Sequence, residues 1–324
     1  MSTYRLFGLT LRSHLPLALP EACGCVPDVR IVPWRGPDSA LRAKTPALDS
    51  IADTYGGPTT YQLFCQPHED VLRVGAVADF SIRRRVIGCS TGPAADPGRV
   101  QRCLLTTVIA LWLERRGWPV LHGAAIEVDD GAVLLLASGY TGKSTLAARL
   151  VRAGFRILTD DLVAVEKRQD GFFVKSSYPS IGLWPGPNLG SSFQALPLAP
   201  RVHPSVDKRS MRLEPSAFCS HARRIDAVYT LHRDCSGSTD FPIRFEGLSP
   251  GAGAIECVRH SFVPRTVEAG GLQQERLALI ASLTSAMPVV RVHYPSGFDY
   301  LGLVCDRIVE HTRVTRRVHS PGVH

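Results

Sequence analysis

The hydrophobic pattern of the chain is clearest from residue 99 onward, where it predicts a helix followed by a pair of strands. From Arg99 to Arg116 apolar residues recur at helical spacing, and Gly117-Trp118-Pro119 ends the run. Two apolar stretches follow, Val120–Val128 and Ala132–Ala137, and a turn sequence at Asp129-Asp130-Gly131 joins them. Because the second stretch is apolar on both faces, we expect it to be a central strand of a sheet.

A loop, a helix and a strand come next. Ser138–Gly142 has the composition of a loop, and Lys143–Ala153 is predicted to be a helix that ends at Gly154. Phe155–Leu158 is predicted to be a short strand ending at Asp160-Asp161. The order strand, loop, helix, strand is that of a P-loop unit. We therefore expect an α/β fold with some α+β character, in which a P-loop domain contains a mixed sheet.

The first 97 residues are predicted to form a small β-rich domain. Short apolar or alternating runs, separated by Gly, Pro and Asp, predict strands at Tyr4–Leu11, Tyr61–Cys65, Val71–Val77 and Phe80–Ile87. The stretch 33–46 is predicted to be a loop, and the Pro- and Gly-rich stretch 92–98 a linker. We therefore place one domain at residues 1–97, as a candidate for substrate recognition, and the P-loop domain at residues 98–324.

The chain beyond the acidic pair is predicted to continue the P-loop domain. Strands are expected at Leu162–Lys167, Phe172–Ser176, Ala227–His232 and Val289–Tyr294, and helices at Gln273–Met287 and Phe298–Thr312. The Pro- and Gly-rich region Tyr178–Pro204 is expected to have little regular structure and to be a functional loop. The last residues, Arg313–His324, are expected to be frayed.

Composition places the chain among ordinary globular proteins. Of its 324 residues, 44% are hydrophobic and 20% are charged, and no segment approaches the roughly 20 consecutive apolar residues of a membrane span. We therefore expect a soluble protein without membrane association. The first residues lack the apolar run of a secretory signal, which favours a cytoplasmic location. The nine cysteines are odd in number and scattered, so reduced thiols are expected.

The net charge of +8 raises the question of an anionic partner. Arginines are dispersed along the chain, with clusters only at Arg83-Arg84-Arg85, Arg223-Arg224 and 313–317. We therefore do not expect a nucleic-acid partner.

The strongest chemical motif runs from Ala137 to Thr145 and fits the Walker A pattern, with Ala in place of the usual first Gly. Backbone amides of the loop and the N-terminus of the following helix are suited to a nucleotide's phosphates. Lys143 is expected to neutralise the β- and γ-phosphates, and the hydroxyl of Ser144 to bind Mg²⁺. The predicted ATP-binding residues are Ser138, Gly139, Tyr140, Thr141, Gly142, Lys143, Ser144 and Thr145. The alternative is an ordinary Gly-rich turn before a helix.

Three further residues near this motif are candidates for catalysis. Asp160 and Asp161 follow a short apolar strand, where one carboxylate can hold Mg²⁺ and the other can accept a proton from an attacking hydroxyl. A turn in which the aspartates accept backbone hydrogen bonds is the alternative. His122 lies on the strand before the P-loop strand, from which it could reach a phosphate or the acidic pair. By itself such a histidine is more often structural.

At these residues the sequence resembles the catalytic domain of the HPr serine kinase/phosphorylase family. The shared order is His-Gly, a hairpin, an apolar strand, a Gly-Lys-Ser loop, a short helix and Asp-Asp, with similar separations, over residues 120–168. The resemblance implies a P-loop domain of HPr-kinase type. It also implies that Asp160 is the base toward a protein serine, that Asp161 and Ser144 bind Mg²⁺, and that His122 belongs to the phosphate and acid site.

The sequence also departs from that family. A further acidic metal ligand of the family has no counterpart in the stretch Ile181–Pro187, and the loop for reverse phosphorolysis is not recognisable. These departures favour a kinase without efficient phosphorylase activity. Short phrases such as Tyr4–Leu11, Leu183-Trp184-Pro185 and Asp207-Lys208-Arg209 resemble the HPr-kinase-like subgroup associated with lasso-peptide biosynthesis. In that subgroup a precursor peptide is phosphorylated, typically at a C-terminal serine. Lys208 and Arg209 are candidates to contact phosphate or a peptide carboxylate.

The leading hypothesis is therefore an ATP- and Mg²⁺-dependent serine kinase that acts on a peptide or small protein, preferably a lasso-peptide precursor. A kinase for an HPr-type carrier protein is one alternative. A small-molecule kinase or carboxykinase-like enzyme shares the P-loop scaffold and is a second. The third is a nucleotide-dependent assembly protein without catalysis. Fold resemblance alone does not decide among these functions. The oligomeric state is also left open, and a homo-oligomer is one possibility.

Overall fold

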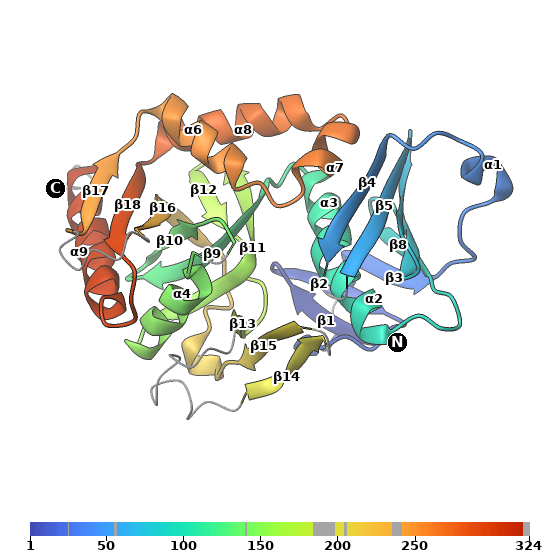
Figure 1. Ribbon diagram of the computed structural model, residues 1–324, viewed down its shortest axis with the longest axis horizontal. Coiled ribbons are helices and arrows are strands. Elements are labelled where there is room, and N and C mark those ends of the chain that lie inside the picture. Colours follow the sequence, from blue (N-terminus) through green and yellow to red (C-terminus); the bar gives the residue numbers. More distant parts are fainter. Residues whose placement is uncertain are drawn as a thin grey trace. The chain divides into compact units, whose positions relative to one another are not determined.

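The computed structural model describes residues 1–24, 26–54, 57–139, 141–183, 198–203, 206–234 and 242–319. The chain divides into two compact units (Figure 1). The first unit comprises Met1–Val120, Pro200–Lys208 and Phe262–Arg276, and the second comprises Leu121–Ala199, Arg209–Ser261 and Leu277–His324. The boundary predicted at residues 97–98 therefore falls inside the first unit, at the beginning of a helix.

The first unit is built on a mixed sheet with the strand order β1-β2-β3-β8-β7-β6-β5-β4. The β2–β3 and β3–β8 pairs are parallel, and the other neighbours are antiparallel. The strands are β1 (Ser2–Leu6), β2 (Leu9–Ser13), β3 (Val29–Pro33), β4 (Leu48–Thr54), β5 (Gly57–Gln66), β6 (Glu69–Val74), β7 (Ala78–Ile82) and β8 (Val86–Ser90).

Two of the predicted N-terminal strands are in fact hairpins. The stretch 4–11 turns at Phe7-Gly8, whose φ values of 53° and 70° are both left-handed. The stretch 80–87 turns at Arg83-Arg84-Arg85 between β7 and β8. The region 33–46, predicted to be a loop, contains the short helix α1 (Ser39–Arg42). Tight turns of this kind do not interrupt an apolar pattern strongly enough to be seen in the sequence.

The helix predicted at 99–116 is confirmed as a continuous helical run in three parts. They are α2 (Pro97–Cys103), the π-helical turn η1 (Leu104–Val108) and α3 (Ile109–Glu114). Asp96 caps the N-terminus by accepting from the Arg99 amide over 2.7 Å. At the other end, Arg115 holds both oxygens of the Asp70 carboxylate, at 2.6 and 2.7 Å, and so fixes the helix end to β6. A further short helix, α7 (Pro264–Ala269), also belongs to this unit.

The second unit contains a mixed sheet with the order β10-β9-β11-β12-β16-β18-β17 and an additional β10–β16 pairing. Its strands are β9 (Val120–Val128), β10 (Gly131–Leu136), β11 (Arg156–Arg168), β12 (Gly171–Val174), β16 (Arg223–Asp234), β17 (Arg244–Gly247) and β18 (Val289–Pro295). Because β10 pairs with β9 on one side and with β16 on the other, its predicted central position is confirmed. The mixed α/β architecture expected from the sequence is likewise confirmed.

Two hydrophobic layers cover the faces of this sheet. Along β10, Val133 and Leu135 pack with side chains of α4 (Lys143–Arg152) and α9 (Leu301–His319), while Leu134 and Leu136 pack toward α6 (Pro250–Arg259) and α8 (Gln273–Ala286). Figure 1 shows α6 and α8 together on one side of the strands. The alternation is the period-two pattern of a strand buried on both faces.

Three predictions for the second unit were wrong. The two strands expected on either side of Asp160-Asp161 form one strand, β11, which continues through the pair although Asp161 adopts a left-handed φ of 67°. The region 178–204 is not without regular structure, since it contains β13 (Ser180–Leu183) and β14 (Leu198–His203); the intervening 184–197 lie outside the described residues. The C-terminal residues 313–319 are helical, because α9 extends to His319.

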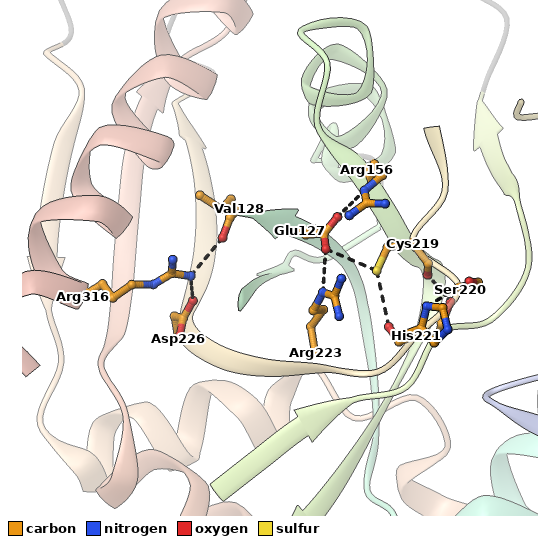
Figure 2. A network of polar contacts seen from close by, with 10 residues as sticks. Glu127, Val128, Arg156, Cys219, Ser220, His221, Arg223, Asp226 and Arg316 are labelled. Carbon is orange, nitrogen blue, oxygen red and sulfur yellow. Dashed lines mark hydrogen bonds and ion pairs between the residues drawn. The ribbon is translucent and has the colours of Figure 1, made fainter. Parts of the chain in front are cut away.

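Ion pairs link the strands that carry the predicted site, as Figure 2 shows. Glu127 of β9 is buried and accepts from Arg156 of β11 at 2.5 Å and from Arg223 of β16 at 2.6 Å. Next to them, Arg316 of α9 pairs with Asp226 of β16 and donates to the Val128 carbonyl over 2.9 Å. β9, β11 and β16 are therefore tied together beside the central strand, and the last helix is anchored to them.

The remaining described elements are β15 (Val206–Arg212) and the 3-10 turn η2 (Pro215–Ala217). β13 pairs antiparallel with β15, with Gly182 opposite Ser210 and Leu183 opposite Arg209. Within the described part of the chain, no helix combines the length and the apolar character required to cross a bilayer.

Candidate functional site

The P-loop connects the end of β10 to the beginning of α4. Ala137, in place of the usual first Gly, is fully buried at the end of the strand. Gly142 is the N-cap of α4 and has a φ of 97°, a conformation that favours glycine. Ser138 and Gly139 are exposed and Thr141 is half-buried, while Tyr140 lies outside the described residues. The loop therefore presents exposed backbone next to a helix N-terminus, which is the environment that phosphate groups bind.

Lys143 lies between the acidic pair and a strand carbonyl. Its Nζ is 3.3 Å from Asp161 Oδ1 and 3.5 Å from Asp160 Oδ1, and it donates to the Gly123 carbonyl over 3.4 Å. Only 5% of the residue is exposed. The structure thus brings the P-loop lysine and both predicted carboxylates together, although they are far apart in sequence.

The two carboxylates have different surroundings. Asp160 Oδ1 accepts from the Ser144 hydroxyl over 3.0 Å, and its Oδ2 accepts from the Gly182 amide, also over 3.0 Å. The Asp160 side chain is 4% exposed, whereas that of Asp161 is 33% exposed. Asp160 is therefore held by the P-loop and by β13, and Asp161 is the carboxylate that is open to solvent.

The contact with Gly182 lies in the described part of the stretch that has no acidic residue. Gly182 supplies a backbone amide to Asp160. Sequence reasoning did not identify this contact. A backbone donor leaves no signature in the sequence, so only the β11–β13 arrangement reveals it.

Two further strands of the sheet, β16 and β18, also contribute side chains that were not predicted. The Tyr294 hydroxyl, at the end of β18, donates to the Thr141 carbonyl over 3.0 Å. A Cβ placed on Gly142 would lie 3.9 Å from Arg233 Nη1, which puts this guanidinium beside the loop. Since β10, β16 and β18 run parallel, their carboxyl ends meet at the P-loop. In the sequence, polar residues at the carboxyl ends of the predicted strands were the signal that could have identified these side chains.

His122 lies on β9 next to Gly123, whose carbonyl accepts from Lys143. Its amide donates to the His260 carbonyl over 2.6 Å, and its side chain is half-buried. Burial lowers the pKa of His260, with Lys143 also lowering it and Glu256 opposing, so the neutral imidazole is favoured there. Gly123 is required by packing, because an added Cβ would lie 2.6 Å from a Leu136 methyl group.

Lys208 and Arg209 both lie on β15. The side chain of Lys208 is outside the described part of the structure. The Nε of Arg209 is buried and has no hydrogen-bond partner, so this guanidinium retains an unused donor. Arg209 is opposite Leu183, the neighbour of Gly182. It is therefore placed one strand away from the backbone that contacts Asp160.

The donor set at the P-loop is compatible with magnesium. Among the described residues, no three His, Cys, Asp or Glu side chains are grouped as a metal cage. What the site offers is the Ser144 hydroxyl with the carboxylates of Asp160 and Asp161. Mg²⁺ is usually held by one or two carboxylates together with water and substrate phosphates. These residues therefore fit a magnesium ion that binds with a nucleotide.

No family model matches the chain. The chain is similar to two proteins described as HPr kinase/phosphorylase. It is 33% identical over 85 residues to the protein of Listeria welshimeri, and the match covers 26% of this chain and 27% of the relative. It is 32% identical over 81 residues to the protein of Listeria monocytogenes, and that match covers 24% of this chain and 26% of the relative. The chain thus matches about a quarter of the length of these relatives.

Among solved structures, the HPr(Ser) kinase/phosphatase from Coxiella burnetii resembles this chain with a TM-score of 0.35 and 11% identity, over 61% of this chain and 98% of the other. About a quarter of the chain is therefore similar in sequence to HPr kinase/phosphorylases, a resemblance that the Walker A motif and the acidic pair had indicated.

Proposed function

We propose that this protein is an ATP-dependent serine kinase of HPr-kinase type. The observation that carries the proposal is the group formed by Lys143, Ser144 and the two aspartates at the end of the P-loop. A P-loop lysine and serine beside two carboxylates supply phosphate binding, metal binding and a base at one place. The similarity to HPr kinase/phosphorylases supports a serine as the acceptor.

In this proposal the loop from Ser138 to Thr145 binds the nucleotide. Amides of the loop and the N-terminus of α4 bind the phosphates, and Lys143 moves from its carboxylate partners to the phosphate charge. Mg²⁺, held by Ser144 and Asp161, supplies charge neutralisation when bound. Catalysis is then mainly a matter of positioning and electrostatics, since phosphoryl transfer needs little covalent help from the protein.

Asp160 is proposed to accept the proton of the attacking serine, as the family resemblance implies. One observation favours an exchange of roles. Asp160 is buried and accepts from Ser144, the expected metal ligand, whereas Asp161 is the more exposed carboxylate and is easier for a substrate hydroxyl to reach. The exchanged assignment, with Asp160 on the metal side and Asp161 as the base, is therefore the second candidate.

Three further residues have proposed roles around this centre. His122, next to the carbonyl that binds Lys143, is proposed to belong to the phosphate and acid site. Arg209, which has an unused buried donor, is proposed with Lys208 to contact a phosphate or a carboxylate of the peptide. These assignments extend the site from the P-loop toward β15.

The preferred substrate is a lasso-peptide precursor with a C-terminal serine. This finer assignment is supported by the short sequence phrases that resemble the lasso-associated subgroup. The protein is proposed to act in the cytoplasm, where ATP and a precursor peptide are available. The N-terminal residues 1–97 are proposed to take part in substrate recognition.

The experiment is a transfer assay with γ-labelled ATP, Mg²⁺ and three acceptors: a precursor-type peptide ending in serine, the same peptide ending in alanine, and an HPr-type carrier protein. Label on the serine peptide alone is the expected result, with the modified residue located by mass spectrometry. Label on the carrier would support the carrier-kinase alternative. Label on an added metabolite would support a small-molecule kinase. ATP binding without transfer to any hydroxyl would contradict the kinase proposal.

A further inference from the structure

A cavity in the first unit lies at one end of its sheet, and none of its lining residues belongs to the P-loop motif. It has a volume of about 1040 Å³. One wall is the turn between β5 and β6, at Pro67-His68, and another is the turn between β7 and β8, at Arg83-Arg84-Arg85. The third wall is the end of α3 with the residues after it, up to Trp118. All these residues belong to the same unit, so the cavity is a property of that unit alone.

The lining of this cavity carries an excess of positive charge. Its arginines are Arg83, Arg84, Arg85, Arg115 and Arg116, and its acidic residues are Glu69 and Asp70. Arg83 pairs with Glu69 at 3.0 Å, and Arg115 pairs with Asp70 at 2.6 Å. Within the described part of the chain, Arg84, Arg85 and Arg116 have no acidic partner. Three guanidinium groups at the cavity therefore retain charge that the fold itself does not neutralise.

Arg116 is held in place without being neutralised. Its guanidinium carbon lies 4.8 Å from the ring centre of Trp112 and 5.5 Å from that of Trp118. Its Nε is buried and has no hydrogen-bond partner. Contacts with aromatic rings orient a guanidinium but leave its N–H donors available. A buried donor without a partner costs free energy, which an acceptor bound in the site would recover.

We propose that this cavity binds a peptide segment rich in Asp and Glu, whose carboxylates pair with Arg84, Arg85 and Arg116. Planar guanidinium groups match carboxylates through paired N–H donors. The volume slightly exceeds the roughly 300–1,000 Å³ of ligand pockets, so it suits several linked anionic groups better than one small anion.

The aromatic lining argues against a nucleic-acid ligand. Single-stranded nucleic acids bind to exposed aromatic rings on which their bases stack. Trp112 is only 2% exposed, and Arg116 lies over both tryptophans. The cavity thus offers charge without a free stacking surface, which fits a peptide with carboxylate side chains. Binding of this peptide does not require phosphoryl transfer, so the proposal stands apart from the kinase function.

The experiment measures binding of a fluorescein-labelled peptide of alternating Glu and Ser to the full chain by anisotropy. A peptide with Gln in place of Glu is the matched ligand control. We expect the Glu peptide to bind and the Gln peptide not to bind, and we expect the affinity to fall as salt is raised. Equal binding of the two peptides, or no binding of either, would overturn the proposal.

Variants locate the binding site. Arg84→Ser with Arg85→Ser changes two exposed residues of a turn, and should weaken binding of the Glu peptide roughly tenfold. Arg307→Ser, on the exposed face of α9, removes one positive charge elsewhere and should leave binding unchanged. Arg116→Lys keeps the charge near the tryptophans and should bind more weakly than the parent protein but better than Arg116→Gln.

Two results would reject the cavity as a peptide site. One is an unchanged affinity of the Arg84→Ser/Arg85→Ser protein for the Glu peptide. The other is strong binding of polyphosphate or a single-stranded oligonucleotide together with failure of the Glu peptide to compete. Transfer to a serine peptide, measured on the same variants, reports on the kinase proposal independently of these outcomes.

Discussion

The hydroxyl of Tyr294 donates a hydrogen bond to the carbonyl oxygen of Thr141 over 3.0 Å. The bond joins the end of β18 to the P-loop, although β18 is not the strand that leads into the loop. Tyr294 is 2% exposed and packs in the core with α9, so its hydroxyl is a fixed donor. The loop backbone is therefore held from β18, two strands away from β10, as well as by α4.

Replacing Tyr294 by Phe should weaken ATP binding roughly threefold to tenfold without unfolding the protein. The reason is that a net hydrogen bond contributes about 0.5–1.5 kcal/mol, and here it restrains the loop that binds phosphate. Calorimetric titration with ATP and Mg²⁺ measures the effect. Tyr229→Phe is the matched control, because its hydroxyl bonds Thr312 instead of the loop. Equal losses of affinity in both variants would contradict a specific role for Tyr294.

Lys143→Met should lose at least about a hundredfold in phosphate transfer, since one lost electrostatic donor at a transition state typically costs 10²–10³ in rate. Met keeps an apolar stem in the buried position and removes the charge together with its hydrogen-bond donors. Lys167→Met, on the same sheet with its Nζ bonded to Ser282, is the control and should keep the parental rate. The measurement is single-turnover transfer to a serine peptide, and circular dichroism reports on folding. Parental activity of a folded Lys143→Met protein would remove the central claim.

Glu127→Gln should destabilise the second unit by about 1–3 kcal/mol, because it weakens charge-assisted bonds to Arg156 and Arg223. Burial alone would raise the pKa of Glu127, but its bonds to Arg223 and Arg156 outweigh burial and lower it. Because the pKa of Glu127 is lower in the folded state, the charged carboxylate stabilises the folded protein at pH values above the unfolded pKa of about 4.3. This contribution is lost as the pH falls through the folded pKa. The difference in stability from the parent should thus be constant above about pH 5 and shrink in more acidic solution. Urea unfolding across this range tests it, and a difference that grows toward low pH would refute it.

Glu114→Gln should change the pH dependence of protein stability in the opposite sense to Glu127→Gln. Burial raises the pKa of Glu114 to about 7, against the lowering effects of Arg276 and of the Val120 amide. The native state then binds a proton that the unfolded state has released between about pH 4.5 and 7, so stability falls over that interval as the pH rises. The Gln variant lacks this titration. Thermal unfolding should show that the stability of the variant relative to the parent increases with pH up to about pH 7. If the two plots of stability against pH are parallel, Glu114 does not titrate in this interval.

The local elements of the site could be predicted from the sequence, but their long-range contacts could not. The strand Val120–Val128 and the helix after Gly142 follow from apolar periodicity and from a loop that needs glycine. The acidic pair was expected at the end of a short strand. Asp161 instead takes a left-handed φ inside β11, a conformation that Asp adopts more readily than most other residues.

Contacts such as Gly182 to Asp160 and Tyr294 to Thr141 depend on which strands are neighbours. That order is set by tertiary pairing, since β13 pairs with β15 and β18 lies parallel to β16. No short stretch of sequence encodes such pairings. The amide of Gly182 has no side chain to mark it, so even a complete motif search would have missed it.

The acidic pair gives the test that separates a kinase from an ATP-binding module. If Asp160 is the base, Asp160→Asn should keep ATP·Mg²⁺ binding and lose roughly 10²–10⁴-fold in transfer, the usual contribution of general acid–base catalysis. Asp161→Asn, which removes a charge from the metal site, should instead raise the magnesium concentration required for binding and activity. The hydrogen bond from Ser144 to Asp160 makes the reverse outcome the signature of exchanged roles.

Nucleotide binding titrated against Mg²⁺, and single-turnover transfer to a serine peptide, should be measured for both variants. Gln replacing Glu166, a β11 carboxylate that pairs with Arg168 and Lys175, is the control for loss of one charge on the same strand. For the division of roles to hold, Asp160→Asn must fail in the transfer rate and Asp161→Asn in the magnesium dependence. If both transfer phosphate at the parental rate, neither carboxylate is the base, and the Lys143–Asp160 pair serves only to hold the empty P-loop in shape.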